Sequence, residues 1–291
     1  MMKIILIFVF YMNTALASER HLMYVPHSGG IADFAARVLA NVEGNTVVVN
    51  YPATIGSRAV PLAFEKKKLL FTGSSYLVIN QIMYPDYKHF DISSNFDTII
   101  LGKVPNVVSL NGSIDIKTIS EFKRYKFNDL RYGVTTAASH VGVLEFLNLT
   151  GINGRAIPYK SGEQLNMGLL SNEIQLKVGN LSSMIGLMGT NKIRVIGITT
   201  EKRHNDYPDI PTIREQTGNN LISVLYYGVS FPHGMNPSSK KYWQKFIMNI
   251  HKNEKYIQET EKLGAEFELI ADENYKKWYK GQIELYRKYE L

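Results

Sequence analysis

A strand, a glycine-containing turn and a helix follow one another in residues 22–39, which read LMYVPHSGGIADFAARVL. The apolar run Leu22–Val25 predicts a short buried strand that ends at Pro26. Apolar residues then recur at the spacing of one helical face, and they are Ile31, Phe34, Ala35, Val38 and Leu39. A strand that leads directly into an amphipathic helix predicts an α/β fold, with helices covering a sheet.

The turn between this strand and this helix is a candidate anion-binding site. Its residues are His27, Ser28, Gly29, Gly30 and Asp33. Free N–H groups at a helix N-terminus attract an anion. A Cβ at Gly29 or Gly30 is expected to block the approach of the backbone to a ligand, or to strain a positive φ. An ordinary turn, in which Asp33 interacts with the helix dipole and pairs with Arg37, explains the same residues equally well.

The alternation of strand and helix continues along the chain. Before residue 111 we expect strands at 46–49, 69–72, 96–101 and 107–110, with a helix near 76–83. Together with residues 22–39 this βαβαβ pattern predicts a parallel sheet covered on both faces. The pattern restarts with helices at 120–125, 141–149, 164–170 and 184–188 and strands at 132–135, 156–157, 174–178, 193–199 and 224–231. Helices at 243–261 and 275–289 close the chain, so we expect two compact α/β units.

The first residues are typical of a secretory leader. Lys3 precedes an apolar run from Ile4 to Met12, and Ala15-Leu16-Ala17 forms a small-x-small cleavage site. The apolar run is far shorter than the roughly 20 residues that span a bilayer. We therefore expect cleavage after Ala17 and a periplasmic mature chain that begins at Ser18.

The composition narrows the functional classes. The chain has no Cys, which excludes disulfides, thiol catalysis and Cys-ligated metals. Its net charge of +7 falls only to +6 when Lys3 is removed, and the basic residues are dispersed. A nucleic-acid-binding protein usually concentrates such charge in one stripe, so we expect a solvated surface and no nucleic-acid partner. A positive field still mildly favours anionic ligands.

A second loop between a strand and a helix carries small and hydroxyl side chains. Its candidate donors are Thr135, Thr136, Ala138, Ser139 and His140, although capping of the helix by Ser139 explains the loop equally well. Ser139 and His140 are also the only adjacent Ser-His pair, but no orienting carboxylate is evident nearby. The sequence has no HExxH, GxSxG or GxxxxGK[ST] motif, so we expect no catalytic residue, metal or cofactor.

The two loops are expected to act together. Ligands of open α/β sheets bind at the carboxyl ends of the strands, and these loops lie in different units. Two such ends that face each other across a cleft could hold both ends of a small diacid. Tyr227 is a further candidate for the cleft, although a tyrosine on a strand is more often a core residue.

Seven segments, in this order, resemble the substrate-binding proteins of tripartite tricarboxylate transporters, also called the Bug family. The segments are Val25–Ala40, Val47–Asn50 with Pro52 and Gly56, Val104–Val108, Tyr132-Gly133 with Ser139-His140, Pro158-Tyr159-Lys160, Tyr207–Ile213 and Leu263–Glu266. The segment Tyr207–Ile213 is the most specific of them, and together they extend over nearly the whole mature chain.

The resemblance implies a type II periplasmic-binding-protein-like α/β fold, with two lobes, two interlobe crossings and a ligand cleft. It divides the chain into a leader at 1–17, lobe one at 18–109 and 225–291, and lobe two at 110–224. It also implies a monomer that captures a small carboxylate, such as a di- or tricarboxylate or an acidic amino acid, for a permease with one large and one small subunit. Ser74, Tyr159 and Gly179 join the expected ligand-binding residues on this basis.

The chain departs from the family pattern near the expected cleft. Its second glycine loop is short, Tyr51 and Ala53 stand where Arg and Gly are usual, and Gly179 replaces a common Asp. The identity of the ligand therefore stays open. An enzyme that uses Ser139 and His140, or a basic exported surface-binding protein, are the alternative functions.

Overall fold

The computed structural model describes residues 20–26, 28, 30–51, 58–83, 91–221 and 223–289. The predicted leader at 1–17, together with His27, Gly29 and Ala53, lies outside these residues. Within the described part of the chain, no helix has the length and apolar character needed to cross a membrane.

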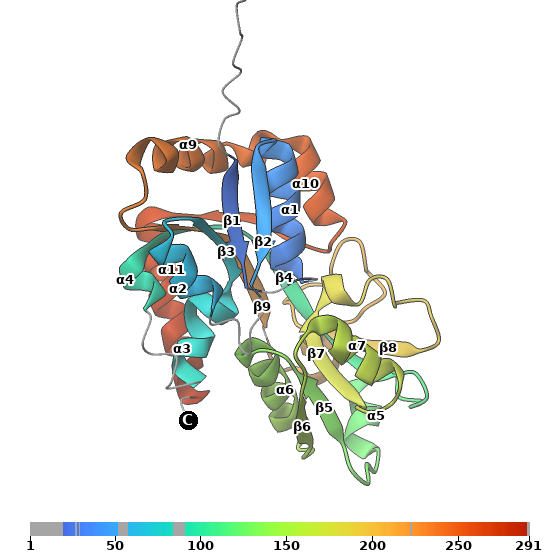
Figure 1. Cartoon of the computed structure of the whole chain (residues 1–291). Helices are drawn as coiled ribbons and strands as arrows, with labels where there is room; N and C mark the ends of the chain where they lie inside the picture. The colour runs from blue at the N-terminus through green and yellow to red at the C-terminus, as the bar shows by residue number, and fades with distance from the viewer. Residues whose placement is uncertain are drawn as a thin grey trace, which may run out of the picture.

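The strands and helices alternate along most of the chain, as expected (Figure 1). The strands are β1 His21–Val25, β2 Thr46–Asn50, β3 Leu69–Gly73, β4 Phe96–Asn111, β5 Arg131–Val134, β6 Arg155–Pro158, β7 Leu176–Asn180, β8 Ile193–Ile198, β9 Val224–Pro232 and β10 Glu266–Ile270. The α-helices are α1 Ile31–Glu43, α2 Ala59–Glu65, α3 Asn80–Met83, α4 Ile92–Asn95, α5 Ile119–Arg124, α6 Ala137–Thr150, α7 Gly162–Leu170, α8 Ile213–Thr217, α9 Pro237–Met248, α10 Glu254–Glu261 and α11 Asp272–Tyr286. Shorter helical segments are a π-helix η2 at Ser75–Ile79 and 3₁₀ turns η4 Leu181–Ser183, η5 Ile250–Lys252 and η6 Arg287–Tyr289.

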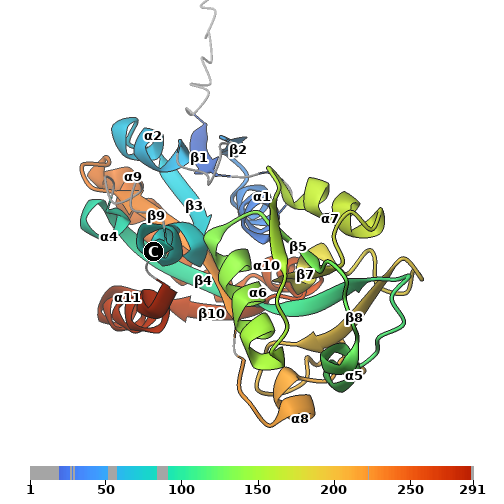
Figure 2. The ribbon, with the colours of Figure 1, turned by 90° about the horizontal axis from the view of Figure 1, so that it is seen from below.

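The strands form two groups that share β4. The first group has the order β2-β1-β3-β9-β4-β10, and the second has β8-β4-β7-β5-β6. Seen from below, β4 runs from one group into the other (Figure 2). Its residues up to Pro105 pair with β9, and its residues from Asn106 pair with β7. Proline cannot donate to a ladder, so it suits the point where β4 changes partners.

The expectation of a parallel sheet is wrong. β1 pairs in parallel with β2 and β3, but β9 lies between β3 and β4 and is antiparallel to both. In the second group β5 is parallel to β6 and β7, whereas β4 is antiparallel to β7 and β8. The sheet is mixed because a strand from late in the chain returns to the first group. A reading of neighbouring segments cannot foresee that insertion.

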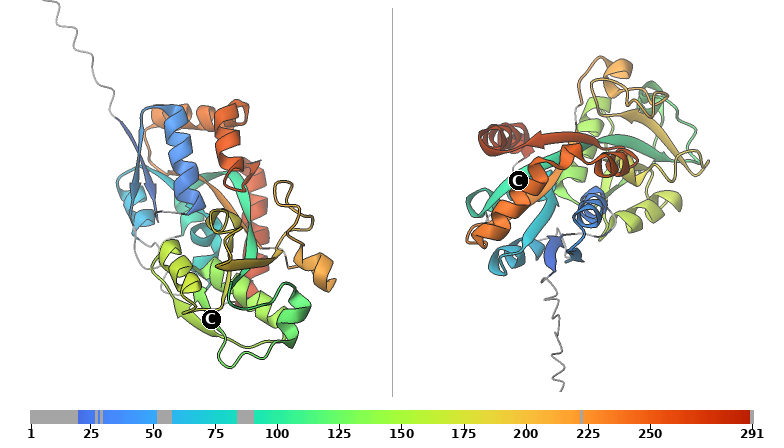
Figure 3. Two further views of the ribbon diagram at one scale, coloured as in Figure 1. Left: turned by 90° about the vertical axis from the view of Figure 1, so that its right-hand side faces the viewer. Right: turned by 90° about the horizontal axis from the view of Figure 1, so that it is seen from above.

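Other expected elements differ in extent. Residues 96–101 and 107–110 belong to one strand, β4, and the expected helix at 243–261 is divided into α9, η5 and α10. The division falls at Asn253, whose side chain accepts a hydrogen bond from the N–H of Tyr256 and starts α10. Residues 184–188 form hydrogen-bonded turns instead of a helix. The sequence reading missed β10, which adds an antiparallel strand beside β4 next to α11 (Figure 3).

Strand β4 and the segment that leads into β9 connect the two lobes. Asn106 donates from its backbone N–H to Ser223 O at 3.2 Å, and its Nδ2 donates to Ser223 Oγ at 2.8 Å. Thr199 Oγ1 donates to Asn106 O at 2.9 Å, which adds a third buried residue to the crossing. These bonds fix the strands relative to each other where they cross. The division of the lobes at residues 109/110 and 224/225 stays a prediction.

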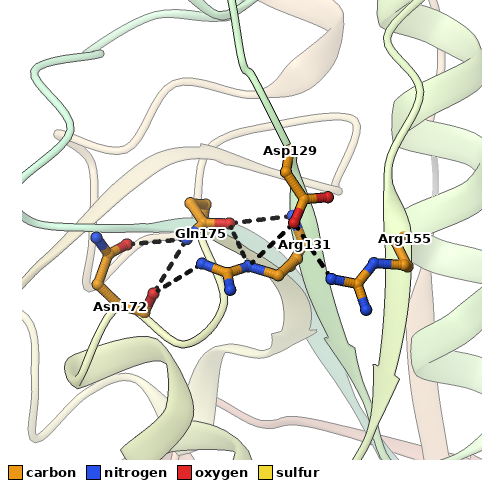
Figure 4. Close-up of polar contacts among 5 residues, drawn as sticks. All are labelled: Asp129, Arg131, Arg155, Asn172 and Gln175. Atoms are coloured by element: carbon orange, nitrogen blue, oxygen red, sulfur yellow. Dashed lines mark hydrogen bonds and ion pairs between the residues drawn. The ribbon is translucent and has the colours of Figure 1, made fainter.

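A polar cluster holds β5, β6 and β7 together where β5 and β6 begin (Figure 4). The backbone N–H of Arg131 donates to Gln175 Oε1 at 3.0 Å, and its side-chain Nη2 donates to Asn172 O at 3.4 Å. Arg155 donates to Asp129 Oδ2 at 3.2 Å. These contacts link the first residues of β5 and β6 to each other and to the segment that precedes β7.

Candidate ligand-binding cavity

A cavity of about 140 Å³ lies where the two lobes meet. The segments that follow β1, β3, β5, β6 and β7 line it, together with residues of both crossings. The carboxyl ends of strands are the usual position of a ligand in open α/β sheets. The two candidate loops, which lie far apart in the sequence, thus face the same cavity.

The first loop brings the N-terminus of α1 to the cavity. Gly30 is the N-cap residue and supplies no side-chain cap, and the first helical hydrogen bond runs from Phe34 N–H to Gly30 O at 3.0 Å. The N–H groups of Ile31 and Ala32 precede that bond, and both residues line the cavity together with Ser28. A helix N-terminus of this kind carries partial positive charge and suits an anion.

Part of the expectation for Gly30 is wrong. Its φ is −115°, so no positive φ has to be strained. A Cβ built on Gly30 meets no atom of the described residues within 4 Å. Among the described residues there is therefore space for a Cβ at this position.

Asp33 makes the ion pair that its spacing predicts. Its carboxylate lies 3.1 Å from Arg37 Nη2 and accepts a hydrogen bond of 2.8 Å from Asn50 Nδ2. The Asp33 side chain is only 5% exposed and lines the cavity. Arg37 compensates its charge, so Asp33 does not impose an uncompensated negative charge on the cavity.

The second loop is ordered by a reciprocal cap of α6. Ser139 N–H donates to Thr136 Oγ1 at 3.3 Å, while Ser139 Oγ accepts from the N–H groups of Thr135 and Thr136 at 3.0 and 3.1 Å. The Ser139 hydroxyl donates to Thr136 O at 2.8 Å. The capping role of Ser139 is confirmed, and the N–H of Ala138 is a remaining first-turn donor at the cavity.

The Ser139-His140 pair has no nucleophile–base geometry. The Ser139 proton is directed at a backbone carbonyl, and His140 Nε2 lies 3.4 Å from the Tyr132 hydroxyl. Burial lowers the pKa of His140, so the ring is predominantly neutral at pH 7. His140 is not part of the cavity lining.

The other predicted site residues divide into two groups. Gly179 lines the cavity. Ser74, Tyr159 and Tyr227 do not line it. Ser74 Oγ accepts from Tyr226 N–H at 3.3 Å, and Tyr227 is fully buried against Phe71 in the core. Tyr159 packs on α7, where its hydroxyl fills the space of a Cβ at Gly168.

Three buried polar side chains of the lining were missed by the sequence reading. Thr72 Oγ1, Ser75 Oγ and Asn180 Nδ2 have no hydrogen-bond partner among the described residues. A buried polar group without a partner is costly, by about 1–3 kcal/mol. The lining of the cavity thus includes residues whose buried polar atoms have no partner among the described residues. Single Ser, Thr and Asn residues next to strands carry no signal that distinguishes them from ordinary caps.

Lys177 is the other residue that was missed. It lies in the middle of β7, lines the cavity, and is 5% exposed. Burial lowers its pKa from 10.5 to about 7. A signal was present in the sequence, because a lysine between Leu176 and Val178 stands inside a predicted buried strand.

The described residues contain no cluster of His, Cys, Asp or Glu that could hold a metal ion.

Two lobes, joined by two crossings and enclosing a cavity lined by helix N-termini and small polar groups, define a periplasmic-binding-protein fold with a small-molecule site. The comparisons with known proteins agree on that class.

Solved structures with this fold are similar over nearly the whole chain. The periplasmic binding protein BugD has a TM-score of 0.82 at 20% identity, over 92% of this chain and 95% of that one. An R. palustris protein solved with adipate has a TM-score of 0.86 at 20% identity, over 94% and 96%. MatC from Rhodopseudomonas palustris with bound malate has a TM-score of 0.80 at 15% identity, over 94% and 99%.

Curated relatives and a match to a family model show to which protein family the chain belongs. The UPF0065 protein of the tcbD-tcbE intergenic region of Pseudomonas sp. (strain P51) is 23% identical over 71% of this chain, which spans 66% of that relative. The UPF0065 protein of the gbd 5' region of Cupriavidus necator is 24% identical over 77% of this chain and 69% of its own length. The tripartite tricarboxylate transporter family receptor pattern matches residues 70–284. The chain belongs to that family of transporter receptors.

Proposed function

We propose that this protein is an exported receptor that captures a small carboxylate in the cavity between its lobes. The observation that carries the proposal is the set of polar side chains of Thr72, Ser75 and Asn180, three residues of the cavity lining whose buried polar atoms have no hydrogen-bond partner among the described residues. An amide N–H and hydroxyl groups match the oxygens of a carboxylate. The two helix N-termini supply further N–H donors and partial positive charge.

The arrangement favours a ligand with two anionic ends. The N-terminus of α1 and the first turn of α6 both contribute residues to the cavity lining, and the two helices belong to different predicted lobes. A hydrogen bond to an ion contributes about 1.5–3 kcal/mol, so two or three such bonds at each end are sufficient for a small diacid. The relatives solved with adipate and malate bind diacids, which supports this class.

Export and delivery are the cellular parts of the proposal. Residues 1–17 have the sequence pattern of a cleaved leader, and the family is one of transporter receptors. We infer that the mature chain is a periplasmic monomer that passes its ligand to a permease with a large and a small subunit. Recovery of the protein from the periplasm with Ser18 as its first residue would support export, and an intact Met1 in the envelope fraction would contradict it.

A thermal-shift screen tests the proposal. The probes are acetate, malate, adipate, citrate and glutamate, with glucose and lysine as controls. At 100 times its dissociation constant a ligand adds about 2.7 kcal/mol of stability. We expect at least one acid to stabilise the protein, and replacement of Asn180 by Leu to weaken that effect. Stabilisation by none of the acids would contradict the proposal.

A further inference from the structure

Lys177 is a buried amine with neutral partners. Its Nζ donates to Asn166 Oδ1 at 2.6 Å and to Ser183 Oγ at 2.9 Å, and the Met184 sulfur lies 4.0 Å away. Ser183 Oγ in turn donates to Asn180 O at 2.8 Å, which fixes its lone pairs toward the lysine. A neutral amine has two N–H donors, and Asn166 and Ser183 satisfy both. A protonated amine has a third, for which only the weak sulfur acceptor is within reach.

No carboxylate faces this amine among the described residues. Helix α6, which carries His140 and Glu145, lies on the Val178 side of β7, since a Cβ built on Gly142 would stand 3.1 Å from Val178 Cγ1. Successive side chains of a strand point to opposite faces, so this is not the side of Lys177. On the lysine side, β4 places Ser109 opposite Lys177, and α7 contributes Asn166.

Other titratable groups lie near the site without contacting the amine. They are Arg131 and Tyr132 on β5, Glu163 on α7, and the cavity-lining residues Asp33, Lys160, Tyr76 and Tyr286. Burial is the only cause of the lowered Lys177 pKa. Asp33 is paired with Arg37 in the other lobe, so it does not provide the missing counter-charge.

The amine lies beside the cavity wall at Gly179. A Cβ built on Gly179 would stand 2.7 Å from Lys177 Cε and 3.6 Å from Lys177 Nζ. A side chain at position 179 would therefore occupy the space of the lysine end. Because residue 179 is a glycine, no side chain at this position stands between the amine and the cavity. Ser183, on the other side of the amine, also lines the cavity.

We propose that Lys177 binds one carboxylate of the ligand and takes up a proton as the ligand enters. The proposal rests on the proposed function and adds a charged, titratable group to the neutral donors of the site. The ligand carboxylate accepts the third N–H that protonation creates, so no atom of the pair is left without a partner. The proton comes from solvent, and it returns to solvent when the ligand leaves.

The acid–base equilibrium of the free protein suits this role. With a pKa of about 7, the buried amine is mostly neutral at pH 8. A carboxylate within hydrogen-bond distance favours the charged form and raises the pKa again. Binding at pH 8 and above is therefore coupled to uptake of nearly one proton. The affinity is expected to fall by about tenfold for each pH unit above 8.

Titration calorimetry tests this with the acids of the screen, in two buffers of different ionisation enthalpy at pH 8. We expect the unaltered protein to take up a proton when the acid binds. In Lys177→Met we expect no uptake and at least about tenfold weaker binding, because a hydrogen bond between charged groups is lost. Lys103→Met is the matched control, a strand lysine that pairs with Glu266 and Glu268 outside the cavity. We expect its binding to be unchanged.

The outcomes separate the two proposals. Binding of an acid without proton uptake, or uptake that persists in Lys177→Met, overturns the role of Lys177 and leaves the proposed function in place. Absence of binding by every acid overturns the proposed function, and the role of Lys177 with it. Absence of proton uptake by the unaltered protein overturns the role of Lys177 even if Lys177→Met does not fold.

Discussion

The hydroxyl of Tyr289 donates a hydrogen bond of 2.6 Å to Oε1 of Glu145, which joins the C-terminal segment of the chain to helix α6 of the second lobe. Lys288 Nζ lies 3.1 Å from the same carboxylate oxygen. The start of α6 also packs near the π-helix η2, where Ala137 and Val141 share an apolar cluster with Leu77. The two predicted lobes are thus also in contact through residues other than those of the Asn106–Ser223 crossing.

We expect this bond to favour the closed arrangement of the lobes. Removing the hydroxyl in Tyr289→Phe takes away about 1 kcal/mol from the closed state, which is up to about a fivefold change in its population. The hinge is expected near residues 108–110 and 221–225. Small-angle scattering should show a larger radius for ligand-free Tyr289→Phe, and calorimetry should show weaker binding of the acid found in the screen.

Tyr242→Phe is the matched control for this change. Tyr242 donates a hydrogen bond of 2.8 Å to Glu43 Oε1, and both residues belong to the first lobe. Its loss is expected to lower stability without opening the lobes. An identical radius for Tyr289→Phe and the unaltered protein, with and without ligand, would show that the Glu145 contact does not control closure.

Local sequence patterns were sufficient for most elements of the fold. The strand–turn–helix of residues 22–39 appears as β1 and α1, because a buried strand and an amphipathic helix each carry their own periodicity. The order of the strands could not be obtained in this way. β9 enters between β3 and β4 through pairs such as Phe71 with Val229, which are 158 residues apart. No local pattern encodes such a contact.

The cap of α6 is expected to affect both stability and ligand binding, and comparison with the cap of α5 distinguishes the two effects. Thr136→Ala is expected to lower stability by about 1 kcal/mol and also to weaken ligand binding, because the capped loop lines the cavity. Thr118→Ala removes the same reciprocal cap from α5, away from the cavity. For Thr118→Ala we expect the same loss of stability in urea unfolding as for Thr136→Ala, but no loss of affinity for the ligand. Equal affinities for the two variants would show that the α6 loop does not contact the ligand.

Gly30 offers a test of the helix N-terminus of α1. A Cβ there meets no atom of the described residues within 4 Å, so we expect Gly30→Val to fold while its side chain obstructs the ligand. Gly186→Val is the control, because that glycine also has no neighbour within 4 Å and does not line the cavity. We expect at least about tenfold weaker binding for Gly30→Val alone. Full affinity would place the ligand away from α1.

Lys177 also makes a prediction about stability without any ligand. The pKa of Lys177 is about 7 in the folded protein, whereas an ordinary lysine, as in the unfolded chain, has a pKa of 10.5. Between these two pH values the unfolded chain therefore binds more protons than the folded protein. Stability attributable to this residue therefore rises with pH in that window, by up to about 1.4 kcal/mol per unit. Lys177→Met should be more stable than the unaltered protein by an amount that is largest below pH 7 and shrinks toward pH 10. Urea unfolding from pH 6.5 to 9.5 measures this difference, and a constant difference would contradict the burial of a titrating amine.

The site was less accessible to sequence reasoning than the fold. Loops with glycine or hydroxyl residues next to helices indicated both walls of the cavity, and Ser28, Gly30 and Thr136 do line it. Thr72 and Asn180 could not be identified in advance, since their importance lies in having no partner in the folded chain. Tyr227 was a candidate for the cleft, yet it is fully buried in the core, which is the more usual place for a tyrosine on a strand.

The central claim is that the cavity recognises carboxylate groups by their charge. Calorimetry with adipate and with its uncharged diamide tests this most directly, because the two molecules have the same chain length and differ at the ends. If another acid of the screen binds more tightly, that acid and its amide replace them. We expect binding of the acid and at least about a hundredfold weaker binding of the amide, from the loss of charge-assisted hydrogen bonds at each end. Equal affinities for the acid and the amide, or binding of neither, would contradict the account.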